Sequence, residues 1–187
     1  MNFLEKNSTL ILVVTAVLIF ASAGLIGLSS FDHDGKYVNP DEYTAEDLMV
    51  KSNQLGAGWE FSDEVKDGSL LRTFVKDGTG SIRAFLTLVD SPATADNAYE
   101  AAKGKAIEKV TAEGVEDLSI FEKSFRYYDE DEKAWSYVLL DLNVIVIILI
   151  DVSDEDRPNW LINNITSAIQ KNIHKVAEKY VPQPVLQ

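Results

Sequence analysis

The sequence predicts an α/β (α+β) protein, with a single N-terminal transmembrane helix followed by one α/β/α sandwich domain with a mainly antiparallel sheet. Three observations predict it: an uncharged apolar run near the N-terminus, a set of short extended segments joined by tight turns, and amphipathic helical segments before, between and after them. The chain has 187 residues. That length leaves room for one domain of ordinary size beyond the anchor.

The apolar run extends from Leu10 to Leu28 and carries no formal charge. As a helix rising about 1.5 Å per residue it spans about 28 Å, close to the hydrocarbon thickness of a bilayer. Lys6 precedes the run and acidic residues follow it, which predicts a cytoplasmic N-terminus and an extracytoplasmic domain at the cell membrane. The alternative is a signal peptide and secretion after cleavage near Ala23, in the small-residue pattern Ala21-Ser22-Ala23. Continuation of the run to Leu28 favours the retained anchor.

Four parts follow from this reading. Residues 1–29 form the anchor, 30–43 a linker, 44–181 the extracytoplasmic α/β domain, and 182–187 a tail. The linker is polar and contains Gly35 and Pro40, which are typical of irregular segments.

The domain begins with a predicted helix and a group of strands. Thr44 with Asp47 three residues later is an N-capping pattern, and apolar residues at helical spacing carry one helix from there to Gly56. An extended stretch starts at Trp59 and turns at residues 66–68. Residues 70–76 and 82–89 alternate as strands, and Asp77-Gly78 between them predicts a hairpin turn.

A second helix and a second group of strands follow. Ser91 and Pro92 are a favourable cap and first position for a helix that runs to about residue 112. Strands are expected after Gly114, before the acidic turn 129–132, and over 135–141. Residues 144–150 are apolar at every position, which indicates a central strand buried on both faces. A last amphipathic helix runs from about residue 157 to 180.

This layout is similar to that of a known family. The carriers are the helix end Leu55-Gly56-Ala57-Gly58-Trp59, the helix start Ser91-Pro92-Ala93-Thr94-Ala95, and the late apolar hairpin before a C-terminal helix. Over about residues 44–180 they resemble PsbP-like α/β/α sandwich domains, in layout and without a diagnostic motif. Such families serve mostly as accessory or binding proteins, so the resemblance implies a non-enzyme and transfers no functional residue.

Composition excludes several classes of function. Lys and Arg number 17 against 30 Asp and Glu, a formal net charge of −13, which argues against binding to nucleic acid or to an anionic membrane surface. The absence of Cys excludes disulfides and thiolate chemistry. His33 and His174 are the only histidines and are expected to be exposed, without partners. We therefore expect no catalysis and no cofactor.

Acidic clusters are the candidates for a cation site. Asp129, Asp131, Asp151 and Asp154 supply carboxylates of the kind that hard cations prefer. Neither cluster fits the twelve-residue calcium loop, and a solvated turn or a helix start explains each equally. Asn164-Ile165-Thr166 is a glycosylation sequon on the predicted extracytoplasmic side.

Two functions from different classes remain. The first is an accessory or structural subunit of a membrane protein assembly, with another membrane protein as its partner. The alternative is a cell-surface module that binds a small ligand or cation in a cleft between sheet and helix. A large exposed apolar patch would favour the first, and a deep polar-lined pocket would favour the second.

Overall fold

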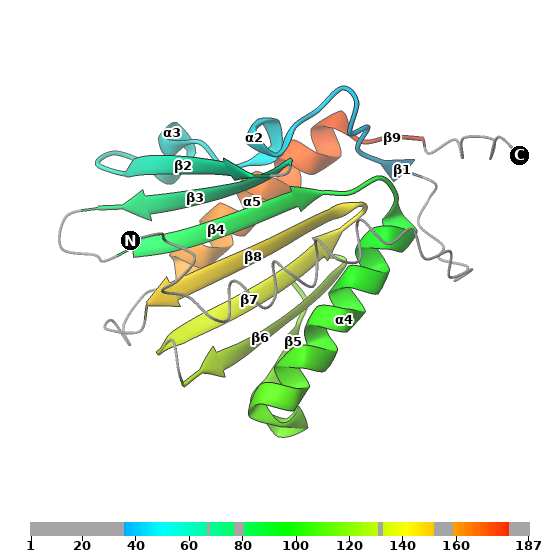
Figure 1. Ribbon diagram of the computed structural model, residues 1–187. Helices are drawn as coiled ribbons and strands as arrows, with labels where there is room; N and C mark the ends of the chain where they lie inside the picture. Colours follow the sequence, from blue (N-terminus) through cyan, green and yellow to red (C-terminus); the bar gives the residue numbers. More distant parts are fainter. Residues whose placement is uncertain (1–35, 67, 77–80, 131–132, 152–158, 180–187) are drawn as a thin grey trace, which may run out of the picture.

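The structure is a computed structural model that describes residues 36–66, 68–76, 81–130, 133–151 and 159–179 (Figure 1). The predicted anchor Leu10–Leu28, His33, Asp131, Asp154 and the tail 182–187 lie outside these residues. Within the described ranges, no helix combines the length and the apolar character needed to cross a membrane. The anchor therefore stays a prediction.

Seven strands form one sheet, and the predicted antiparallel arrangement is confirmed. Its order is β2 (Glu60–Lys66), β3 (Ser69–Val75), β4 (Ser81–Leu88), β8 (Val144–Asp151), β7 (Ala134–Asp141), β6 (Lys123–Asp129) and β5 (Val115–Leu118). Two meanders, β2–β3–β4 and β5–β6–β7–β8, meet where β8 pairs with β4. Consecutive strands pair within each meander because their connections are short, and a tight connection is sufficient to join antiparallel neighbours.

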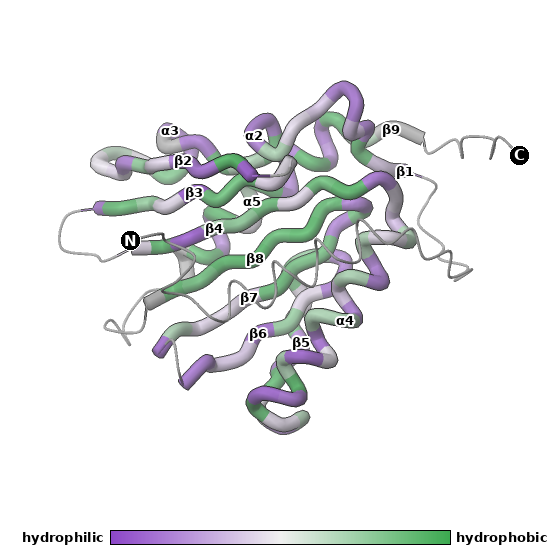
Figure 2. The backbone as a smooth tube through the Cα atoms, in the orientation of Figure 1, coloured by the Kyte–Doolittle hydropathy of each residue, from purple (hydrophilic) through white to green (hydrophobic). Residues whose placement is uncertain are grey.

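β8 is the middle strand, and the prediction that it is buried on both faces is confirmed. Ile145 and Ile147 pack into one apolar cluster, while Val146 and Ile148 pack into another on the opposite face. Figure 2 shows hydrophobic residues along most of the strand. A strand with apolar residues at both parities needs a covering layer on each side of the sheet.

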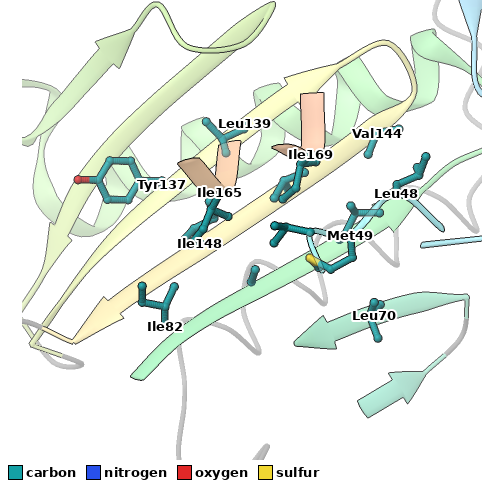
Figure 3. Packing of buried hydrophobic residues seen from close by; sticks show 14 of the residues in the cluster. Leu48, Met49, Leu70, Ile82, Tyr137, Leu139, Val144, Ile148, Ile165 and Ile169 are labelled. Atoms are coloured by element: carbon teal, nitrogen blue, oxygen red, sulfur yellow. The ribbon is translucent and has the colours of Figure 1, made fainter. Parts of the chain in front are cut away.

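Helices supply both layers, so the architecture has three layers (Figure 1). α4 (Pro92–Val110) covers one face, here called the α4 face, and contributes Ala95, Ala98 and Tyr99 to its core. α5 (Asn159–Val176), with the short helices α2 (Ala45–Leu48) and α3 (Ser52–Leu55), covers the other, the α5 face. Figure 3 shows this second core, in which side chains from α5, α2 and the sheet interdigitate.

The cap predicted for α4 is confirmed, whereas a single helix up to Gly56 is wrong. Ser91 Oγ accepts a hydrogen bond from the Thr94 backbone N–H at 3.2 Å. The first helical segment is instead divided into α2 and α3 by Met49 and Val50, both fully buried. The link departs from the helix because Met49 and Val50 fill the core of the α5 face, and the Val50 carbonyl oxygen accepts a hydrogen bond from Arg72 of β3 rather than from a following helical turn.

The chain ends of the described domain pair with each other. β1 (Lys36–Tyr37) and β9 (Glu178–Lys179) form a two-stranded antiparallel sheet, and α5 ends at Val176 rather than near residue 180. Val38, directly after β1, is fully buried. Val38, within the predicted linker, is thus packed into the domain.

Candidate interaction surface

A part-buried ion pair stabilises the margin of the sheet next to α2 and α3. Arg72 of β3 is almost fully buried and contacts Asp63 of β2 through two hydrogen bonds, Nε to Oδ1 at 2.7 Å and Nη2 to Oδ2 at 2.6 Å. Its Nη1 donates to the Val50 carbonyl oxygen at 2.7 Å, and its guanidinium lies 4.1 Å from the centre of the Phe61 ring. Because the bidentate fork has a fixed geometry, Arg72 joins the hairpin rigidly to the α2–α3 segment.

Two open hollows lie between the α2–α3 segment and the β2–β3 hairpin. One has a volume of about 310 Å³ and the other about 640 Å³, and Glu46 lines both. We call the two together the β2 groove. Its wall residues are Pro40, Tyr43–Asp47, Lys51, Asn53, Phe61, Val65, Gly68–Leu70, Arg72 and Leu88.

The two ends of the β2 groove differ in chemistry. Tyr43, Val65 and Leu88 make the smaller hollow largely apolar, whereas charged residues line the larger one. Asp47 is already committed to the α2 cap, because it accepts hydrogen bonds from the Thr44 backbone N–H at 2.9 Å and from Thr44 Oγ1 at 2.8 Å. These bonds hold the pKa of Asp47 below its usual range.

β2 presents an unusual amount of exposed apolar surface beside the groove. All seven of its residues are exposed, and the exposed fractions of Phe61 and Val65 are 43% and 71%. The register pairs Phe61 with Phe74 and Val65 with Leu70, and both partners belong to the core of the α5 face. Phe61 and Val65 therefore project from the same side of the sheet as the groove.

β2 is also a free edge within the part of the chain that the structure describes, since it pairs there only with β3 (Figure 1). The opposite edge, β5, has four residues, and its exposed acids are occupied: Glu116 pairs with Arg126 and Asp117 with Lys103. Short length and charged side chains protect a sheet edge against pairing with another strand. β2 also carries charged residues, but it is longer, and two of its side chains are large and apolar.

Of the four predicted cation ligands, the structure describes Asp129 and Asp151, and these two do not lie together. Asp129 is fully buried on β6, and its Oδ2 atom lies 2.7 Å from Lys109 Nζ of α4, so its charge is already balanced. Asp151 ends β8, and the register places Ala134 of β7 between it and Asp129. No group of three or more metal-binding side chains occurs among the described residues. Asp131 and Asp154 lie outside them.

The Asn164 sequon lies within α5. Asn164 is exposed, but Thr166 is fully buried and its Oγ1 hydroxyl donates to the Ile162 carbonyl oxygen at 2.8 Å. The threonine hydroxyl of the sequon is thus engaged inside the helix. Glycosylation at Asn164 stays a prediction.

His174 is exposed, as expected, but it has a partner that spacing along the chain did not reveal. Its imidazole is 59% exposed, and Nε2 lies 2.9 Å from Oδ2 of Asp141, a buried residue that ends β7. Burial raises the pKa of Asp141, and the His174 and Gln170 side chains oppose that rise. The two residues are 33 positions apart, so only the packing of α5 onto the sheet joins them.

Comparisons with known proteins found no match to the chain among family models, curated proteins or solved structures. The site is therefore interpreted from its own residues. Sequence reasoning identified the β2 strand but missed its exposed apolar side chains, because strand order decides which strand is an edge. The pattern of apolar Phe61, acidic Asp63 and apolar Val65 was the available signal.

Proposed function

We propose that the chain is a non-catalytic, membrane-anchored extracytoplasmic domain that acts through protein–protein contact, as an accessory or structural subunit of a membrane protein assembly. The observation that carries the proposal is the β2 surface: an edge strand with every residue exposed, bearing Phe61 and Val65 next to an open groove. Exposed apolar side chains beside a free strand edge are typical of protein-binding surfaces.

The anchor is part of the same proposal. It rests on the uncharged run Leu10–Leu28 and on the charges that flank it. The layout similar to PsbP-like domains supports an accessory role in the same way, as an analogy of element order.

A small-ligand module is less well supported by the groove. Both hollows are open rather than enclosed, and Asp47 and Arg72 at the charged end already bond to Thr44, Asp63 and Val50. A ligand site normally encloses its ligand and presents a few unengaged polar groups to it. A protein partner, by contrast, can bind an open groove and cover the exposed apolar side chains beside it.

Copurification from mild-detergent extracts tests the proposal. The full chain, tagged at its C-terminus, is expected to migrate on native gels above its own size with a copurified membrane protein. Val65→Glu should lose that partner, because a charge in the contact must be desolvated. Ile107→Glu is the matched control, since Ile107 is an exposed apolar residue of α4 with an exposed fraction of 38%. Migration of the unaltered chain alone, or equal recovery with both variants, would refute the accessory role.

A further inference from the structure

The sequence of β2 is complementary to itself when two copies run antiparallel. With Asp63 at the centre, Glu60 lies opposite Lys66 and Phe61 lies opposite Val65, and symmetry forms each of these pairs twice. We propose that two copies of the chain join edge to edge through β2, around a two-fold axis at Asp63, into one continuous antiparallel sheet. This rests on the proposed function for the location of the contact, and it names a second copy as the first partner of that surface.

The side of the sheet to which each β2 side chain points, together with the charges of β2, favours this register over its neighbours. A two-fold axis perpendicular to the sheet keeps the α5 faces of both copies on one side, so residues of equal parity must lie opposite each other. A shift of two residues in one direction places Glu60 opposite Glu64, and a shift in the other places Glu64 opposite its own copy. Like charges directly opposite are unfavourable, whereas opposite charges and apolar pairs are favourable.

The central pair is compensated within each copy. Asp63 lies opposite its symmetry mate, but each carboxylate already accepts two hydrogen bonds from the buried Arg72 guanidinium. Two guanidinium groups thus accompany two carboxylates at the axis, and the local charge is balanced. The Phe61–Val65 pairs on either side would cover the most exposed apolar side chains of the strand.

Pairing would also align the two β2 grooves. Both open on the α5 face, and the axis keeps these faces on the same side, so the grooves become neighbours across the new strand pair. An anchored chain favours this contact further, because tethering to one membrane raises the effective concentration of the second copy. A strand edge of seven residues then suffices for association that would be weak between free domains.

Charge exchange tests the pairing in the full chain, solubilised in detergent and examined by light scattering coupled to size-exclusion chromatography. The unaltered chain should be dimeric. Glu60→Lys alone, or Lys66→Glu alone, places like charges opposite each other twice and should weaken the dimer by about 10-fold to 100-fold. A mixture of the two variants, carrying different tags, should restore dimers that contain one copy of each. Monomeric unaltered chain, or dimers indifferent to all these changes, would overturn the proposal.

Cysteine pairing tests the register, since the chain has no cysteine of its own. Ser62→Cys in one tagged copy and Glu64→Cys in the other should form a disulfide on mild oxidation, because residues 62 and 64 lie opposite each other. Ser62→Cys in both tagged copies is the control and should link far less, because residue 62 lies opposite its own copy only in a shifted register. Equal linking in both mixtures would contradict the register.

The outcomes also separate this inference from the proposed function. If Glu60→Lys is monomeric and still copurifies a membrane protein, the pairing and the accessory role are both supported. If the unaltered chain is monomeric while Val65→Glu loses a copurified protein, the self-pairing is refuted and the accessory role stands. If the chain is dimeric and no other protein copurifies, the pairing stands and the accessory role is refuted.

Discussion

Asn143 lies in the turn between β7 and β8 with its side chain fully buried, and it holds three segments together. Its Oδ1 accepts from the Val38 backbone N–H at 2.7 Å, while its Nδ2 donates to the carbonyl oxygens of Val38 at 2.8 Å and Val89 at 2.6 Å. One amide thereby satisfies three backbone groups on segments far apart in sequence. This residue fixes Val38, which follows β1, and Val89, which follows β4, to the central hairpin.

Asn143→Ala is expected to lower the free energy of unfolding by about 2–4 kcal/mol, because it leaves buried backbone donors and acceptors without partners. Chemical unfolding of the detergent-solubilised chain measures the loss. Asn39→Ala is the control, since Asn39 makes an exposed hydrogen bond to the Asp41 backbone N–H at 3.1 Å. A loss no greater than in the control would mean that the amide does not hold these segments.

The pair of Asp141 and His174 predicts a pH-dependent stability. Burial raises the folded-state pKa of Asp141 above its unfolded value, so the folded protein binds this proton more tightly. The contribution of Asp141 is therefore most favourable below the unfolded pKa and is lost as pH rises through the folded pKa. His174, which lowers that pKa, limits the loss.

His174→Ala should raise the folded-state pKa of Asp141 further and destabilise the domain at neutral pH, with the difference from the unaltered protein shrinking in acid as Asp141 becomes protonated. Unfolding midpoints across pH 3–8 measure this. Lys171→Ala, at an exposed position of the same helix, should show no such pH-dependent difference. A deficit that is constant across this range would contradict electrostatic coupling between the two side chains.

Among the elements, those governed by local chemistry could be predicted and those governed by long-range packing could not. The Ser91 cap and the apolar β8 strand follow from short-range rules. The division of the first helix at Met49 and Val50 depends on the sheet surface that both residues fill. The interaction surface could not be predicted either, because the position of β2 at the edge depends on the order of the strands in the sheet and not on the sequence of β2 itself.

Three described element boundaries carry a positive φ that their residue types disfavour, at Thr111, Lys133 and Leu142. Lys133 precedes β7 in the connection from β6 and has a φ of 49°, in the left-handed region. Side chains beyond glycine are destabilised there by contact between Cβ and the backbone. The turn forms because the β6–β7 register places its two ends side by side.

Lys133→Gly should therefore stabilise the domain by about 0.5–1 kcal/mol, the relief of strain exceeding the added entropy of the unfolded chain. Thermal or chemical unfolding measures the gain. Lys105→Gly, in the middle of α4, is the matched control and should destabilise by about 1 kcal/mol. If both glycines destabilise equally, the left-handed conformation at Lys133 imposes no cost.

For the whole molecule, the central hairpin β7–β8 connects both cores and the chain ends. Its two faces pack against α4 and α5, its turn holds Val38, and its Asp141 contacts the last turn of α5. The three-layer order could be predicted from the sequence, because groups of strands alternate with helices along the chain and short links join them. The contribution of residues 36–43 was not, since this segment is largely polar and Val38 is its only deeply buried residue.

The extent of the folded unit can be tested by shortening the chain. A chain that begins at residue 36 keeps β1, the burial of Val38 and its bonds to Asn143, and should fold with a single unfolding transition. A chain that begins at residue 44 loses about 1.5–3 kcal/mol of stability from apolar burial. It also leaves the buried Asn143 amide without its Val38 partner, which costs about 1–3 kcal/mol more. Val38→Ala in the longer chain isolates the apolar part and should account for roughly half the loss. Equal unfolding midpoints for the two lengths would show that the domain begins at Thr44 and that the contact with Asn143 is dispensable.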